Sequence, residues 1–394
     1  MSALLIEPFD NASDNNGDIS ADITRGLTSG LARIPASSVI AQESAIVLAR
    51  QGLTATEIGR KFGVGFVLRG TSLMQGTHVR ATIVLLSTQT EMELLNEAFE
   101  KPFVQLRVME QEIVTRVAKE LGMPLMFETD HGQTWSEHDT DTLTALLRAD
   151  AILMMPQTTQ TLAAAEQLYT AVLRAKPNDT EALTGMAAIR LAKALADAHP
   201  LPDALECQRL LDQVLALEPQ NARALNLLGA LRRATGKRTE ALAAYQAAVE
   251  ANHSDASAHA QIGRLKIDLG EPEHALSAIN LALRLSPLDP QRPLWYTFAG
   301  LAKLYLNAPA EAREWLTKAV EAGPKFVTAP VFLAAAQQID GKDKEAHRLI
   351  QAARAMSPAL SISRVERQFA PESPRLRESW LRILDSLRHA GLPD

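Results

Sequence analysis

The stretch that decides the fold is residues 222–289, which divide into two consecutive blocks of equal length. The first block, 222–255, reads ARALNLLGALRRATGKRTEALAAYQAAVEANHSD, and the second, 256–289, reads ASAHAQIGRLKIDLGEPEHALSAINLALRLSPLD. Gly236 and Gly270 hold the same position in the two blocks, and apolar residues recur at helical spacing on both sides of them. Each block therefore predicts two helices joined by a turn.

The same period continues through the second half of the chain. Pro324 and Pro358 are separated by the same interval as Gly236 and Gly270, and small residues recur at matching offsets. A helix–turn–helix unit of about 34 residues is typical of a tetratricopeptide repeat. We predict about six such repeats over residues 143–360, stacked because one repeat cannot bury its own apolar face. A capping helix and tail are expected within residues 361–394.

Residues 1–127 show a different pattern, in which short β-rich runs alternate with helical segments. Residues 3–9 and 37–42 predict strands, and residues 66–87 predict a hairpin with Gly76 at its turn. Helical patterns are expected at 19–33, 54–62 and 104–121. This half of the chain is therefore predicted to be a compact α/β domain.

These patterns predict an α+β fold, in which a small N-terminal α/β domain (1–127) precedes an all-α tetratricopeptide-repeat superhelix. The polar stretch 128–142 is interpreted as the linker. The 394-residue chain is 46% hydrophobic and 22% charged with a net charge of −6, which is ordinary globular composition. Its single cysteine, Cys207, excludes an intrachain disulfide. No apolar run reaches membrane-spanning length, so we expect a soluble, cytoplasmic chain.

Four segments of the N-terminal half carry a family resemblance: IEPFDNAS, LARIPASSVIAQESA, IGRKFGVGFVLRGTSLMQGTHVRATIVLLS and EQEIVTRVAKELG. They resemble the TolB-like α/β module of bacterial multidomain regulators, which usually precedes tetratricopeptide repeats. In such regulators the module usually follows a winged-helix DNA-binding domain or a class III nucleotide cyclase domain. The segments SPALSISRVERQF and LRHAGLPD resemble the tails of the cyclase-associated repeat proteins. The resemblance implies the sensory half of a larger regulator.

The sequence contains no motif that predicts catalysis. GVGFVLRG has Leu68 where a dinucleotide fingerprint needs its third glycine. LTATEIGRKFGVG superficially matches a helix-turn-helix, but the β-prone FVLRGTSL follows it instead of a recognition helix. The acidic and histidine residues of 128–142 are interpreted as solvated linker, since metal ligands need oriented support. We therefore expect no enzymatic activity, no metal, no cofactor and no direct nucleic-acid binding.

What remains is a groove, because the first helix of each tetratricopeptide repeat lines the concave side of the array. The candidate partner-binding residues at groove-facing offsets are Arg223, Asn226, Arg233, Arg264, Tyr305 and Gln338. The planar fork of Arg suits carboxylates, and an Asn amide can pair with peptide backbone. These side chains therefore predict capture of an acidic or C-terminal peptide segment. The alternative is that they are ordinary solvated charges on soluble helices.

The predicted function is that of a non-catalytic regulatory or adaptor protein, which binds a protein or peptide partner through the concave surface. It is expected to be the sensory half of a signalling or transcription regulator. Two alternatives come from other classes. One is a transcriptional regulator that lacks or borrows its DNA-binding domain, and the other is a nucleotide-cyclase-related protein without its catalytic domain. The sequence does not predict an oligomeric state.

Overall fold

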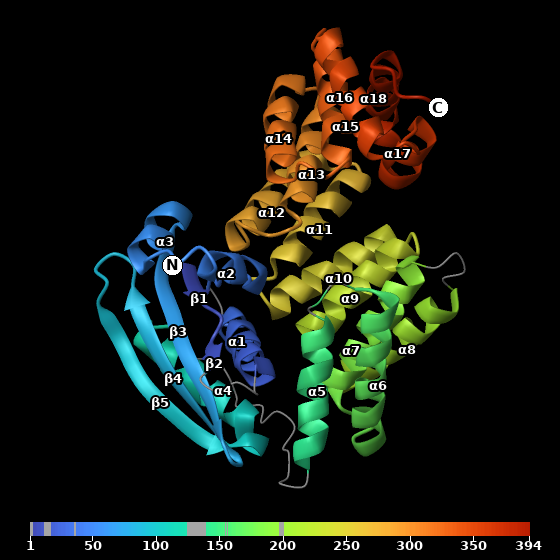
Figure 1. Cartoon of the computed structure of the whole chain (residues 1–394). Coiled ribbons are helices and arrows are strands. Elements are labelled where there is room, and N and C mark those ends of the chain that lie inside the picture. The colour runs from blue at the N-terminus through green and yellow to red at the C-terminus, as the bar shows by residue number, and fades with distance from the viewer. Residues whose placement is uncertain are drawn as a thin grey trace. The chain divides into compact units, whose positions relative to one another are not determined.

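The computed structural model describes residues 3–11, 17–34, 37–123, 139–153, 155, 157–196 and 201–394. The chain divides into two units (Figure 1). Unit 1 comprises Met1–Gly236 with Ala244–Asp255, and unit 2 comprises Lys237–Ala243 with Ala256–Asp394. The fold class is confirmed, because a small N-terminal sheet region is followed by a long run of helices. None of the helices in these ranges has both the length and the hydrophobicity needed to cross a membrane.

A five-stranded sheet opens unit 1. Its strands are β1 (Ala3–Ile6), β2 (Asp10–Asn11), β3 (Val64–Gln75), β4 (His78–Ser87) and β5 (Glu93–Pro102). The strand order in the sheet is β1-β3-β4-β5, and the short strand β2 also pairs with β3. Strands β1 and β2 are parallel to β3, whereas the pairs β3–β4 and β4–β5 are antiparallel. The predicted hairpin is confirmed, since Gln75 pairs with His78 and Gly76 takes a positive φ of 61°.

Helices α1 (Gly17–Ala32) and, after the short turn η1 (Phe103–Gln105), α4 (Leu106–Glu120) cover one face of this sheet. The α/β part also contains α2 (Gln42–Ala49) and α3 (Ala55–Phe62). Side chains at alternate positions of β4 point to one face, and Val79 and Ile83 are fully buried there in a core shared with α1 and α4. The segment after α3 forms the long strand β3, as its β-prone sequence predicted.

The predicted strand at residues 37–42 is wrong. Only Val39 forms an isolated bridge to Leu4, and Gln42 already begins α2. Two backbone hydrogen bonds hold this bridge, from the Leu4 amide to the Ser38 carbonyl and from the Ile40 amide to the Leu4 carbonyl. The apolar run is therefore buried beside β1 without extending the ladder.

The described residues after Asp139 form six helix pairs. The pairs of unit 1 are α5 (Thr140–Leu153) with α6 (Thr159–Ala175), α7 (Thr180–Ala196) with α8 (Leu201–Leu217), and α9 (Ala222–Ala234) with α10 (Arg238–Ala251), which crosses the division between units. Those of unit 2 are α11 (Ala256–Asp268) with α12 (Pro272–Leu285), α13 (Arg292–Tyr305) with α14 (Pro309–Ala322), and α15 (Thr328–Ile339) with α16 (Asp343–Met356). The predicted linker, 128–142, lies outside the described residues up to position 138.

In unit 1 the sheet region and the first repeats share one hydrophobic core. Ile23 and Leu27 of α1 belong to the same buried cluster as Leu146 of α5 and Tyr169 of α6. Burial of this kind is the main favourable contribution to folding. The α/β part is therefore packed on the repeats within unit 1.

One small position in each first helix sets the distance to its partner helix. A Cβ on Gly300 would overlap Cγ of Leu316, and one on Gly263 would lie 2.5 Å from Cγ1 of Ile279. The turn position is equally constrained, because Gly270 has a φ of 90° and Asn307 takes its place in the next repeat with a φ of 57°. Asn is the residue that best tolerates this region after Gly.

The chain ends with α17 (Ile362–Phe369), the turn η3 (Pro374–Leu376) and α18 (Arg377–His389). Five apolar side chains of η3 and α18 are buried: Leu376, Trp380, Ile383, Leu384 and Leu387. Helix α18 packs against α13 and α15, which are the first helices of their pairs. The end of the chain therefore covers the first-helix face of unit 2, the face formed by α11, α13 and α15.

Gly300→Leu should destabilise unit 2, since the added side chain has no space against Leu316. Overpacking of this kind costs about 1–3 kcal/mol. Thermal unfolding followed by circular dichroism should show a transition lower by several degrees. Ala310→Leu adds comparable bulk at an exposed position of α14 and should leave the transition unchanged. Equal transitions in the two variants would contradict the close helix approach.

Candidate partner-binding surface

Three of the six predicted partner-binding residues lie on α9 in unit 1. Arg223, Asn226 and Arg233 recur at intervals of three and seven positions and therefore share one face of the helix. Arg223 and Arg233 are exposed, whereas Asn226 is half-buried and donates a 2.7 Å hydrogen bond to Asp255 Oδ2. We call these three residues the α9 stripe.

Arg223 is held in place by a buried carboxylate, that of Asp150 on α5. The Arg223 Nη1 and Asp150 Oδ1 atoms are 3.3 Å apart, and the side chains are 45% and 1% exposed. Asp150 also accepts a 2.7 Å hydrogen bond from the Tyr169 hydroxyl and lies 3.0 Å from Arg25 Nη2. Burial would raise the pKa of Asp150, but the charges of Arg25 and Arg223 and the Tyr169 hydrogen bond together lower it. Arg223 therefore presents a guanidinium that is fixed on one side and accessible on the other.

The same ion pairs continue into the α/β part of unit 1. Asp22 on α1 pairs with Arg25 of the same helix. The Oδ2 atom of Asp22 also lies 2.5 Å from Nη1 of Arg107 on α4. Arg107 Nη2 reaches Glu181 at the start of α7 at 2.7 Å. Buried charges need such pairing because an isolated one is costly to remove from water. We call this group the junction network: Asp22, Arg25, Arg107, Glu110, Asp150, Glu181 and Arg223.

Glu110 is the member of the junction network with the most perturbed carboxyl pKa. Its side chain is 7% exposed and 3.0 Å from Arg107 Nη1, and it fills the space beside Gly26, where a Cβ would overlap Oε2. Burial raises the pKa of Glu110 to about 8, although the charge of Arg107 opposes the shift. At neutral pH this group is therefore mostly protonated, which leaves three carboxylates for three arginines.

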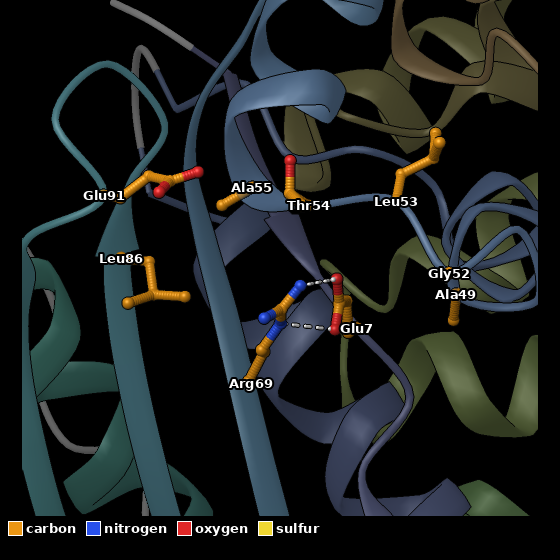
Figure 2. Close-up of a pocket in the computed structure, with 9 residues that line it drawn as sticks. All are labelled: Glu7, Ala49, Gly52, Leu53, Thr54, Ala55, Arg69, Leu86 and Glu91. Carbon is orange, nitrogen blue, oxygen red and sulfur yellow. Dashed lines mark hydrogen bonds and ion pairs between the residues drawn. The ribbon is translucent and has the colours of Figure 1, made fainter.

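A cavity of about 520 Å³ lies on the opposite side of the sheet from the main core (Figure 2). Arg69 of β3 donates to both carboxylate oxygens of Glu7, at 2.8 and 3.1 Å, so this pair lies at the centre of the lining. Leu53 and Thr54 line it from the segment before α3, whose first amides are already satisfied by the Thr54 capping box. Glu7 and Arg69 thus neutralise each other, which leaves Glu91 as the remaining charged residue of the lining, and this arrangement selects no ligand class.

In the described part of the chain, no group of three or more His, Cys, Asp and Glu residues is placed to hold a metal. Cys207 is fully buried, and burial raises the pKa of its thiol to about 12. Such a thiol is a poor nucleophile, because the thiolate is the reactive form.

The other three predicted residues lie in unit 2 and are not an open surface. Arg264 and Tyr305 are 7% and 5% exposed, contrary to the expected accessible groove, because the C-terminal segment, residues 361–394, covers them. The Arg264 guanidinium lies 5.1 Å from the centre of the Phe369 ring and 5.4 Å from that of Phe298. Gln338 is partly exposed and donates to Asp343 at 2.7 Å.

The C-terminal segment follows the ends of the first helices. The amides of Glu372 and Ser373 both donate to the Asp268 carbonyl at 3.1 Å, at the end of α11. The Tyr305 and Trp380 rings are 6.3 Å apart, and the Tyr305 carbonyl accepts a hydrogen bond from Ser379 at the end of α13. The segment thus occupies the surface on which a partner was predicted to bind.

Several buried polar atoms in this part of unit 2 have no hydrogen-bond partner among the described residues: Arg264 Nη1, Tyr305 Oη, Gln337 Oε1, Gln338 Oε1, Trp380 Nε1 and Arg382 Nε. The Arg264 guanidinium itself is paired, because its Nε and Nη2 atoms each lie 3.1 Å from a carboxylate oxygen of Asp268.

Sequence reasoning missed Asp150 and Glu110. Asp150 interrupts the apolar stretch LTALLRADAILMM, and this lone acid on a buried helix is the signal that could have identified it. Glu110 carries no such signal, because it reads as an ordinary polar position of α4. The burial of both carboxyl groups is explained by the arginines that the fold places beside them, Arg25 and Arg223 at Asp150 and Arg107 at Glu110.

Glu110→Gln should remove a pH dependence of stability. The folded pKa of about 8 lies above the usual value of 4.5, so the stability contributed by this protonation is fully present below about pH 4.5 and falls as pH rises toward 8. The wild type should therefore melt several degrees lower at about pH 8 than at about pH 5, and the variant should show a smaller difference. Glu112→Gln, on the exposed side of α4, is the matched control. Equal slopes in wild type and Glu110→Gln would disprove the role of Glu110.

Comparisons with known proteins support two of the predicted repeats. A family model for the tetratricopeptide repeat matches residues 222–255 and 256–287. No curated protein matches the sequence. Among solved structures, PilF of Pseudomonas aeruginosa is 14% identical over 59% of this chain and 99% of its own, with a TM-score of 0.48. MamA is 22% identical over 40% of this chain and 90% of its own, with a TM-score of 0.36. YrrB, described as having an unusual peptide-binding site, is 15% identical over 48% of this chain and 93% of its own, with a TM-score of 0.38. Residues 222–287 therefore carry two tetratricopeptide repeats, a type of repeat that generally serves protein–protein interaction.

Proposed function

We propose that the chain is a non-catalytic interaction module that binds an acidic segment of a protein partner on the α9 stripe. The observation that carries the proposal is the Arg223 guanidinium, which is 45% exposed and oriented by the buried Asp150. A side chain that is already fixed loses little conformational freedom when it binds a carboxylate. Arg223 is therefore better prepared for a partner than a freely moving surface arginine.

The spacing of the stripe suggests the form of the partner. Arg223 and Arg233 are ten positions apart, which is about 15 Å along an α-helix. An extended peptide covers that distance in roughly five residues. A segment with two carboxylates separated by about this length would contact both arginines and would bind more weakly at high salt.

The regulatory role rests on how Arg223 is connected. Asp150 pairs with Arg223 on one side and with Arg25 of α1 on the other. A change in the α/β part that moves Arg25 would alter the position of Asp150 and, through it, of Arg223. Together with the resemblance to TolB-like modules, this supports the sensory half of a signalling or transcription regulator. A DNA-binding domain or a cyclase domain supplied elsewhere would be the output in the two alternatives.

The α9 stripe is tested with the double variant Arg223→Gln and Arg233→Glu. Gln is used at position 223 because a Glu there would place a second carboxylate beside the buried Asp150 and destabilise unit 1. Loss of two charged contacts should reduce partner capture at least about tenfold. The measurement is quantitative mass spectrometry of the proteins that the immobilised chain retains from an extract of its source cells.

The matched control carries the same changes on second helices, Arg174→Gln on α6 and Arg209→Glu on α8. Both positions are exposed, and Arg209 forms a surface ion pair with Glu206. Circular dichroism should show that both double variants are folded. Partners retained equally by the two folded variants would refute binding at the α9 stripe.

A further inference from the structure

The junction network joins the α/β part of unit 1 to its repeats, and Arg107 is the side chain that spans the join. Its Nη1 atom lies 2.5 Å from Asp22 on α1 and 3.0 Å from Glu110 on α4, whereas its Nη2 atom lies 2.7 Å from Glu181 on α7. The side chains of Asp22 and Glu110 are 2% and 7% exposed, and that of Glu181 is 43% exposed. Arg107 therefore has two buried partners and one that water can solvate.

Glu110 lies where an ionised carboxyl group is poorly hydrated. Its side chain packs on the backbone of α1 at Gly26, where an added Cβ atom would overlap Oε2. The Nη1 atom of Arg107 donates to this carboxyl group and lies 3.0 Å from each of its two oxygens. An uncompensated buried charge is costly, so an ionised Glu110 depends on Arg107 for its stabilisation.

The other charged groups of the cluster give an ionised Glu110 little support. Those that α1, α5, α7 and α9 contribute are Asp22, Arg25, Asp150, Glu181 and Arg223. The three carboxylates repel an ionised Glu110, and the two arginines are already paired with Asp150. The charged side chains of β5 that reach α4 pair with Arg116 and Glu112, which lie elsewhere around that helix. Burial, which the charge of Arg107 only partly offsets, therefore raises the pKa of Glu110 to about 8.

We propose that Glu110 is a proton-operated latch between the α/β part and the repeats of unit 1. Loss of its proton draws Arg107 toward the two buried carboxylates and away from Glu181. Glu181 is the partner that gives way, because it is the most exposed of the three and water can replace the arginine. The ion pair between α4 and α7 is then lost, and the α/β part opens more readily. This is a property of unit 1 alone and does not require a partner on the α9 stripe.

Opening of the α/β part should increase with pH. In the closed form the pKa of Glu110 is about 8, and in an opened form it returns toward the usual value of 4.5. Between these two values each unit of pH favours the opened form by up to about tenfold, because that form releases its proton more readily. Opening is therefore suppressed near pH 6, rises as the pH approaches 8, and levels off above it.

Hydrogen exchange of the full chain at pH 6 and at pH 8 measures this opening. The rates are expressed as protection factors, which removes the intrinsic pH dependence of exchange. Amides of α1 should lose protection at least about tenfold between the two pH values. Amides of α8, whose buried side chains belong to a different core cluster, should lose much less. Unchanged protection of α1, or an equal loss in α1 and α8, would overturn the proposal.

Three variants separate the latch from a general loss of stability. Glu110→Gln has the shape of the protonated side chain and should keep α1 protected at pH 8. Glu112→Gln, on the exposed side of the same helix, should behave as the wild type. Glu181→Gln removes the contact that the latch releases, so α1 should already be less protected at pH 6 and should lose less on going to pH 8. A wild-type loss of α1 protection in Glu110→Gln or in Glu181→Gln would refute the latch.

Discussion

Stacking buries the sides of a helix pair that meet the neighbouring pairs, but it does not cover the face formed by the first helices of the array. The first-helix faces stay uncovered by stacking and must be solvated, partnered or covered by other parts of the chain. In unit 1, α1 packs on α5, and Arg107 reaches Glu181 on α7. In unit 2, α17 and α18 cover the face formed by α11, α13 and α15. The chain thus uses its first and last segments on equivalent faces of its two sets of repeats.

The two coverings differ in chemical quality. The junction network of unit 1 pairs its buried charges, and the shifted pKa of Glu110 removes one excess carboxylate at neutral pH. The contact in unit 2 leaves donors and acceptors unpaired among the described residues. A paired network fixes a single arrangement, since removing one partner leaves an uncompensated buried charge. The contact in unit 2 rests instead on buried apolar side chains such as Trp380 and Leu384.

The repeat architecture could be predicted from the sequence because its determinants are local. Gly236 and Gly270 mark the turns, and Gly229, Gly263 and Gly300 mark the close helix contacts, at fixed offsets along the chain. The hairpin at Gly76 was predictable for the same reason. The candidate site was only partly predictable. The exposure of Arg223 and Arg233 follows from helical spacing, but the burial of Arg264 and Tyr305 depends on the C-terminal segment, which lies far along the chain and which no periodicity connects to them.

The order of elements along the chain has a consequence for its synthesis. The α/β part leaves the ribosome first, so a folded cover is ready when α5, α7 and α9 appear. Unit 2 has the reverse order, because α11, α13 and α15 are complete well before α18 has been made. Its apolar first-helix face is exposed to the cell during that interval, and transiently exposed apolar surface promotes aggregation. The second half of the nascent chain therefore exposes aggregation-prone surface that the finished protein covers.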